Sequence, residues 1–174
     1  GLRALPQTAV AEWNWPEDRL RYANATLAEA LIAAGHATGD RDLVRRALGF
    51  LEFLLTRESP DGHLSVTGHS GSLPGEEGRQ FDQQAIEVSA MADACVRAFR
   101  LTGDPTWYRG VRIAWDWFEG RNDAGFPMFD PATGAGYDGL EPGGRNENRG
   151  AESTISALNT FQRAAELGIV GGAR

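Results

Sequence analysis

Three carboxylates stand at the polar starts of two apolar stretches. The stretch FDQQAIEVSAMADAC, residues 81–95, carries Asp82 and Glu87 at the beginning of a run of small apolar residues. The stretch NENRGAESTISALNT, residues 146–160, carries Glu152 in a similar place. Two carboxyl groups that flank a glycosidic bond can cleave it, one as general acid and the other as general base. Asp82, Glu87 and Glu152 are therefore our candidate catalytic residues.

Each of these carboxylates also has a structural interpretation. Asp82 could cap a helix, because aspartate accepts hydrogen bonds from the first backbone amides. Glu87 lies about one turn further on, next to Ile86 and Val88. An unpaired carboxylate is costly to bury, so Glu87 must be paired, protonated or functional. Glu87 and Glu152 could instead bind loop backbone amides and hold the loops in place, and the sequence leaves both interpretations open.

Aromatic and amide side chains near these carboxylates favour a sugar ligand. Flat rings can stack on the C–H faces of a sugar, and amides can bond to its hydroxyls. The predicted substrate-binding residues are Trp13, Trp15, Tyr22, Gln83, Gln84, Asn148 and Arg149. Trp13 and Trp15 have an alternative role, which is to attach the N-terminal segment to the core.

Composition excludes several other chemistries. All 17 basic residues are arginine, so the chain has no phosphate-binding Walker lysine and no lysine for a Schiff base. The net charge of −7 argues against a nucleic-acid partner, whose affinity depends on positive charge. Cys95 is the only cysteine, and its apolar neighbours predict a core residue. No set of histidines and acids has a diagnostic metal spacing, so we expect neither a metal nor a cofactor.

No segment is typical of a membrane or secreted protein. An apolar run of roughly 20 residues would be needed to span a bilayer, and the chain has none. The start of the chain has no signal-peptide pattern, so we expect a cytoplasmic protein. Because the chain opens on Gly1 rather than Met, we also expect it to be a fragment.

An internal repeat organises the chain. Residues 37–55 and 101–119 align without gaps, and Thr38-Gly39-Asp40 falls on Thr102-Gly103-Asp104. In each copy a glycine ends one helix and an aspartate caps the next. Hydrophobic spacing predicts five helices and no strands, which makes the fold class all-α. These helices cover residues 17–35, 41–56, 83–101, 105–119 and 151–167.

The helix faces predict two layers. The helix over 83–101 is apolar almost all round, so other helices must surround it, whereas 41–56 and 105–119 are amphipathic. We expect the first, third and fifth helices to form an inner layer of stacked αα-hairpins. The long connections 57–81 and 120–150 should then converge over the N-termini of the inner helices, where functional loops are common.

Several motifs together resemble one bacterial family. They are RYANATLAEALIAAG, FDQQAIEVSAMADAC, TGDPTWYRGV, NDAGFPMFDPATGAGYDGL and NRGAEST. The family has an α/α-toroid domain, similar to six-hairpin glycosidases, and its members occur in or beside glycosyltransferases. The resemblance implies an (α/α)6-type architecture with a funnel at the inner-helix N-termini. The matching motif positions are Asp82, Gln83, Gln84, Glu87, Asn148 and Glu152.

A full six-hairpin toroid needs more than twice the helices that this chain supplies. Residues 1–174 are therefore expected to form a single helical domain, the C-terminal half of a larger toroid. Its partner would be the upstream half or another copy of the chain. The expected function is a carbohydrate-active module that binds or hydrolyses a glycan. The alternatives are a non-catalytic domain that binds glycan or protein and positions a glycosyltransferase, or a pure assembly scaffold.

Overall fold

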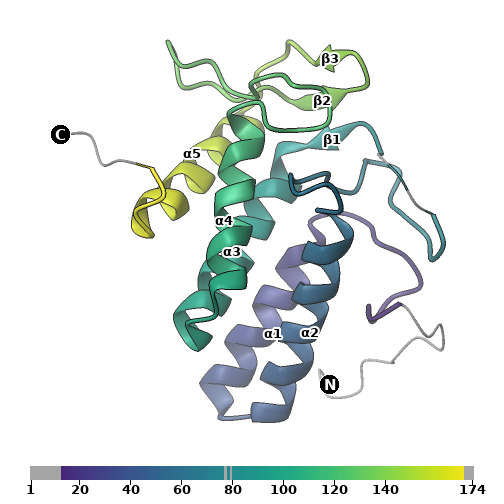
Figure 1. Ribbon diagram of the computed structural model, residues 1–174, viewed down its shortest axis with the longest axis vertical. Helices are drawn as coiled ribbons and strands as arrows, with labels where there is room; N and C mark the ends of the chain where they lie inside the picture. Colours follow the sequence, from purple (N-terminus) through teal and green to yellow (C-terminus); the bar gives the residue numbers. More distant parts are fainter. Residues whose placement is uncertain (1–12, 77, 79, 171–174) are drawn as a thin grey trace.

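The structure is a computed structural model that describes residues 13–76, 78 and 80–170. Within these residues the chain is mainly helical, as predicted, with a small three-stranded sheet at one end (Figure 1). None of the described helices is both long and apolar enough to cross a membrane. The elements are α1 (Asn24–Thr38), α2 (Arg41–Arg57), β1 (Gln83–Gln84), α3 (Ala85–Thr102), α4 (Pro105–Phe118), β2 (Gly139–Glu141), β3 (Gly144–Arg145) and α5 (Ala151–Glu166).

The repeated turns have the predicted chemistry. Gly39 and Gly103 follow α1 and α3, and both adopt a left-handed backbone with φ of 69°. Glycine takes this conformation without the steric cost that a side chain would add. The Asp40 side chain then accepts a hydrogen bond from the Leu43 amide at 3.1 Å, which caps α2. Asp104 caps α4 in the same way, so both αα-hairpins close through the same device.

Helix α3 is the centre of the helical layers. It packs against α1 on one side and α5 on the other, and α4 forms a hairpin with it while α2 forms one with α1. Figure 1 shows α1, α3 and α5 running away from the sheet and α2 and α4 running back toward it. The apolar surround of α3 is confirmed, because most of its residues are buried, including Cys95 with no exposed surface. The odd-numbered helices thus begin at the same end.

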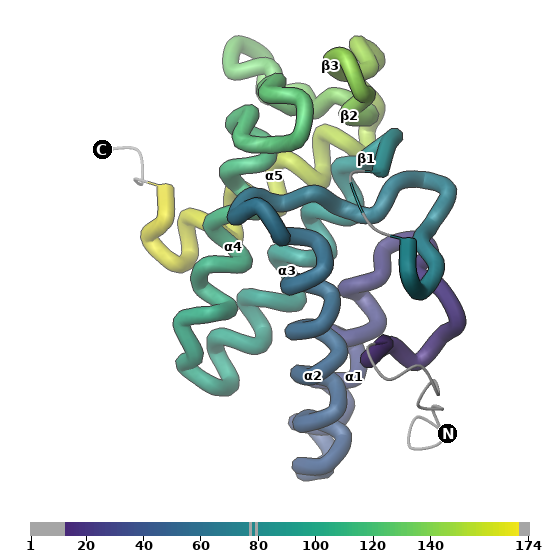
Figure 2. Tube along the Cα trace, turned by 45° about the vertical axis from the view of Figure 1, so that its right-hand side comes forward, coloured from purple at the N-terminus to yellow at the C-terminus, as the bar shows by residue number. Residues whose placement is uncertain are grey.

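The two long loops meet over that end, as expected. Gln83 of β1 pairs with Leu140 of β2, and Leu140 in turn pairs with Arg145 of β3. In the tube view of Figure 2 the end of the first loop meets the second loop near β1 and β2, at the start of α3. The strands themselves were not predicted. They are two or three residues long, which is too short for the alternating pattern that reveals a strand in a sequence.

The predicted start of the first helix is wrong by seven residues. Residues 17–23 are not helical, and Leu20 forms an isolated antiparallel bridge with Ser72 of the first long loop. Ala23 then takes a left-handed conformation with φ of 49°, which turns the chain into α1. Leu20 fits the helical spacing because it is a buried apolar residue. The first long loop buries it, however, rather than a helix–helix contact. The third helix likewise begins at Ala85, because Gln83 and Gln84 belong to β1.

The close contact between α3 and α4 gives a stability prediction. A Cβ at Gly110 would lie 2.5 Å from the Cys95 Sγ, so Gly110→Ala should overpack the core. Overpacking costs about 1–3 kcal/mol, and the better helix propensity of alanine returns at most about 1 kcal/mol. We expect a lower thermal midpoint by circular dichroism, with the loss largely reversed in the double variant Gly110→Ala/Cys95→Ala.

Gly143→Ala is the matched control for this experiment. A Cβ at Gly143 would meet no atom within 4 Å. The thermal midpoint of Gly143→Ala should therefore equal that of the wild type. An unchanged midpoint for Gly110→Ala would contradict the packing described for α3 and α4.

Candidate functional site

A carboxylate from α3 caps the start of α1. The two Glu87 oxygens accept hydrogen bonds from the backbone amides of Ala23, at 2.5 Å, and Asn24, at 3.2 Å. Neither bond comes from the predicted loops, and α1 has no side-chain cap of its own. Glu87 thus supplies the acceptor that the first amides of a helix require, and its ionised form places negative charge at the positive end of the helix.

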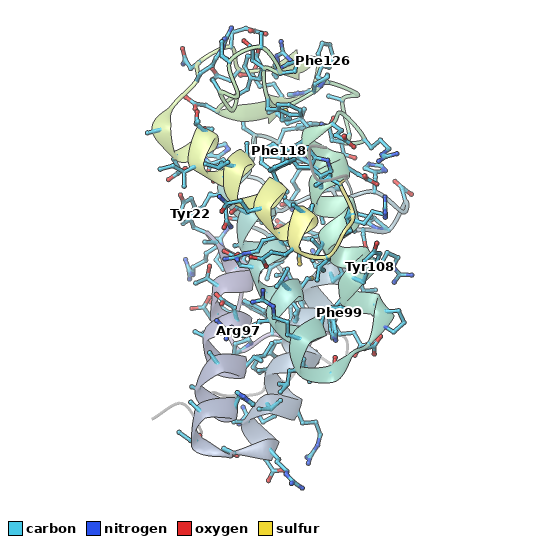
Figure 3. All side chains as sticks on the ribbon, turned by 90° about the vertical axis from the view of Figure 1, so that its left-hand side faces the viewer. Tyr22, Arg97, Phe99, Tyr108, Phe118 and Phe126 are labelled. Carbon is cyan, nitrogen blue, oxygen red and sulfur yellow. The ribbon has the colours of Figure 1, made fainter. Side chains whose placement is uncertain are left out.

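A second contact joins α1 to α5. The Tyr22 hydroxyl donates a hydrogen bond to Oε2 of Glu152, at 3.0 Å. Tyr22 remains 56% exposed, and Figure 3 shows it beside the N-terminal turn of α5. Partial burial, the hydrogen bond to Glu152 and the nearby charges of Glu152 and Glu87 all raise the pKa of the Tyr22 phenol, so it keeps its proton at neutral pH. Tyr22, Glu87 and Glu152 therefore gather where α1, α3 and α5 begin.

Glu58 is a second buried carboxyl group that the sequence did not reveal. It is 3% exposed and accepts hydrogen bonds from the Thr67 amide and hydroxyl at 2.9 and 2.6 Å. Burial, followed by the charge of Glu87, raises its pKa to about 8. Burial likewise raises the pKa of Glu87 to about 7, against the bonds from Ala23 and Asn24. Glu58 lies in the polar sequence TRESPDG, where no apolar flank signals burial.

Asp82 faces solvent on the same end of the molecule. Its side chain is 53% exposed, and its carboxylate lies 4.0 Å from Nδ1 of His69. The Asp82 amide also lies 3.3 Å from this Nδ1. Nε2 lies 3.4 Å from the Ser70 hydroxyl. Asp82 is thus an exposed carboxylate beside a histidine of the first long loop.

Gln83, a predicted substrate-binding residue, is buried and uses both of its amide atoms within the protein. It has no exposed surface; its oxygen accepts from Nε1 of Trp117 at 3.1 Å, and its nitrogen donates to Asp123 at 2.6 Å. The Asp123 carboxylate also binds His63 and Ser65. Burial alone would raise the pKa of Asp123, but the hydrogen bonds from Ser65, His63 and Gln83 outweigh it and lower the pKa. This network locks the two long loops to α4.

Trp13 and Trp15, also predicted to bind substrate, are buried as well. They are 4% and 1% exposed, and they pack edge-on against Phe53 and Phe50 of α2, with ring centroids 5.2 and 6.0 Å apart. The alternative interpretation is confirmed: the two rings attach the N-terminal segment to the core. The sequence could not separate these roles because both need large aromatic side chains.

The remaining predicted residues lie along the loops above the helix ends. Gln84 is half-buried, and its backbone pairs with Gly139. Asn148 is exposed, and its carbonyl accepts a hydrogen bond from the Asp138 amide at 3.0 Å. Arg149 is also exposed, but Asp130 binds its guanidinium at 2.8 Å. Arg149 is thus fixed by its own loop.

The two main cavities among the described residues lie away from Tyr22 and Glu152. One, of about 770 Å³, lies between α2 and the first long loop, with Arg57 and Glu58 on its wall; residues 77 and 79 of this loop lie outside the described residues. The other, of about 230 Å³, lies between α1, α3 and α5. The described residues contain no group of three or more His, Cys, Asp or Glu that could hold a metal ion. The candidate site is therefore an open surface at the helix ends.

Comparison with known proteins adds no assignment. A scan against protein-family models finds no match, and no curated protein is significantly similar to the chain.

The buried carboxyls predict how stability depends on pH. Because the pKa values of Glu58 and Glu87 are raised to about 8 and about 7, the folded state binds protons more tightly than the unfolded state above about pH 4.5. The free energy of unfolding should therefore fall as pH rises from about 5 to about 8. We expect a midpoint about 5 °C or more higher at pH 5 than at pH 8.5, measured by calorimetry.

Glu58→Gln should reduce the difference between the thermal midpoints at pH 5 and pH 8.5, because glutamine does not lose a proton in this range. Glu17→Gln, at an exposed position, should leave it unchanged. A wild-type midpoint that rises between pH 5 and pH 8.5 would contradict the protonation of these two groups.

Proposed function

We propose that the protein is a carbohydrate-active module that binds a glycan where α1, α3 and α5 begin. The observation that carries the proposal is the hydrogen bond from Tyr22 to Glu152, which holds an exposed aromatic ring beside an exposed carboxylate. A ring of this kind can stack on a sugar face while the carboxylate binds a hydroxyl. The exposed Asp82 lies on the loop that leads into α3, at the same end.

Glycoside hydrolysis is the simplest chemistry for such a site. Asp82, as general acid, protonates the oxygen of the leaving sugar. Glu152, which accepts a hydrogen bond from Tyr22, acts as general base and takes a proton from the water that attacks the anomeric carbon. Glu87 is a positioning residue, because both of its oxygens bind the backbone beside Tyr22. Carboxyl groups about 5–5.5 Å apart around a bound glycan would give retention, and a separation of about 6.5–9.5 Å would give inversion.

The helical arrangement supports the same proposal. The inner helices α1, α3 and α5 all begin at one end of the molecule. The two long loops lie over this end and are joined by the pairing of β1 with β2. This is the arrangement that an (α/α)6-type toroid would need, and it fits the resemblance to the toroid family found in or beside glycosyltransferases. Under this proposal the chain is a single cytoplasmic domain, the C-terminal part of such a toroid, and its ligand is a carbohydrate.

A second candidate is a non-catalytic domain that binds glycan or protein and positions a glycosyltransferase. The structural roles of Glu87 and Glu152 favour this candidate. Glu87 is buried as a helix cap, and Glu152 is held by Tyr22. A binding module needs these fixed positions but no proton transfer.

Substitution of the two exposed carboxylates separates these candidates. We would incubate the protein with a panel of α- and β-linked gluco-, manno- and galacto-oligosaccharides, and follow products by chromatography and binding by calorimetry. Asp82→Asn and Glu152→Gln should each lower kcat by about 100-fold or more, because each removes one proton-transfer group. Sugar affinity should change only a few-fold, and the control variant Glu147→Gln should behave as wild type.

The remaining outcomes are equally informative. Sugar binding without turnover in the wild type would select the non-catalytic candidate. Absence of both binding and turnover across the panel would overturn the glycan proposal.

A further inference from the structure

Helix α5 turns its largest apolar side chains toward solvent. Ile155, Leu158 and Phe161 are 65%, 55% and 40% exposed, and their spacing places them on one face of the helix. The residues that α5 buries are small: Ser153, Ser156, Ala157, Thr160 and Ala164. A helix in a soluble protein normally buries its large apolar face, so this exposed row marks a surface that another element should cover.

The internal repeat indicates which element that is. Gly39, Gly103 and Gly168 follow α1, α3 and α5, all with φ near 69° or 68°, so they give a common reference point. Ten residues before these glycines stand Glu29 in α1, Asp93 in α3 and Leu158 in α5. The exposed row of α5 therefore corresponds to the faces of α1 and α3 that carry Glu29 and Asp93.

Both of those faces are covered by the next odd-numbered helix. Glu29 of α1 binds Arg97 of α3 at 2.9 Å. Asp93 of α3 binds Arg163 and Asn159 of α5 at 2.5 and 3.0 Å. Among the described residues no odd-numbered helix covers the same face of α5, and only Phe161, at the end of the row, packs against α4, through the ring of Trp115 at 5.4 Å. The α1–α3 and α3–α5 interfaces each join one inner helix to the next. By continuity, the helix that would cover this face of α5 is the first inner helix of another α1–α3–α5 set.

Helix α1, at the other end of the series α1, α3 and α5, offers a matching surface. Helix α3 contacts α1 through Glu87 and Arg97. Counted from the same glycines, these positions correspond to Ala23, just before α1, and to Ala33 of α1, which belongs to a row of small side chains. This row consists of Thr26, Ala30, Ala33 and Ala37, of which only Ala33 is half-buried and the others are exposed. Small side chains allow a neighbouring helix to approach closely, and large ones can fill the space between them.

We propose that the apolar row of α5 in one copy packs on the small-residue row of α1 in a second copy. The contact continues the order α1, α3, α5 from one molecule into the next. Neither row contains a charged residue, so the contact buries no unpaired charge. Each molecule carries both surfaces, and we expect two copies to pair about a twofold axis, because both contacts then form at once.

Light scattering after size exclusion, with sedimentation equilibrium, tests this association on the whole chain. The wild type should form a dimer at micromolar concentration. Leu158→Arg on α5 and Ala30→Arg on α1 should each raise the dissociation constant at least tenfold, because arginine cannot be buried unpaired in the contact. Leu73→Arg replaces a comparably exposed leucine, at 41%, in the first long loop and should leave the mass unchanged.

Mixing the two variants gives the sharpest result. Each variant retains the surface that the other lacks, so an equimolar mixture should regain a heterodimer through one intact contact. Circular dichroism must show that each variant has wild-type helicity. Leu158→Ser takes the place of Leu158→Arg, and Ala30→Gln that of Ala30→Arg, where the arginine variant does not fold. A monomeric wild type at 100 µM or so would overturn the proposal. So would a dimer that Leu158→Arg disrupts and Ala30→Arg does not, because α5 would then pair with itself.

Discussion

The contact on which the structure depends is the hydrogen bonding of Glu87 to the first amides of α1. It fixes the start of α1 against the start of α3, in a place where the carboxylate has little contact with water. Ala23 adopts a left-handed backbone at this point, a conformation that is uncommon for alanine and that the two hydrogen bonds help to hold. The preceding residue, Tyr22, is thereby directed toward Glu152, which ties α5 to the same end. One buried carboxylate therefore aligns three helices.

The repeat and the helix faces carried most of the fold prediction. The TGD turns, the central position of α3 and the meeting of the loops follow from the spacing of glycine, aspartate and apolar residues, which act locally. The start of α1 did not follow, because Leu20 is buried by a loop distant in sequence. The same limit applies to the site. Burial turns Trp13, Trp15 and Gln83 into packing residues, and a residue type alone does not reveal what covers it.

Glu58 and Asp123 illustrate two ways of burying a carboxyl group. Asp123 receives hydrogen bonds from three side chains, so its ionised form is stabilised and it joins the two long loops. Glu58 is buried and lies near the charge of Glu87, so its protonated form is favoured, and the hydrogen bonds that it receives from Thr67 only partly offset this effect. Both acids therefore belong to the fixed frame of the protein, whereas Asp82 and Glu152 are exposed. Such a frame suits a site whose ligand binds to preformed positions.

The most direct test of the account is the location of a bound sugar. Amide chemical shifts of the ¹⁵N-labelled protein would be followed during titration with the oligosaccharide panel. The account predicts that the largest changes occur at residues 22–24, 82–84 and 149–153, which surround the starts of α1, α3 and α5. Changes confined to the cavity between α2 and the first long loop, or an absence of changes at the helix starts, would contradict it.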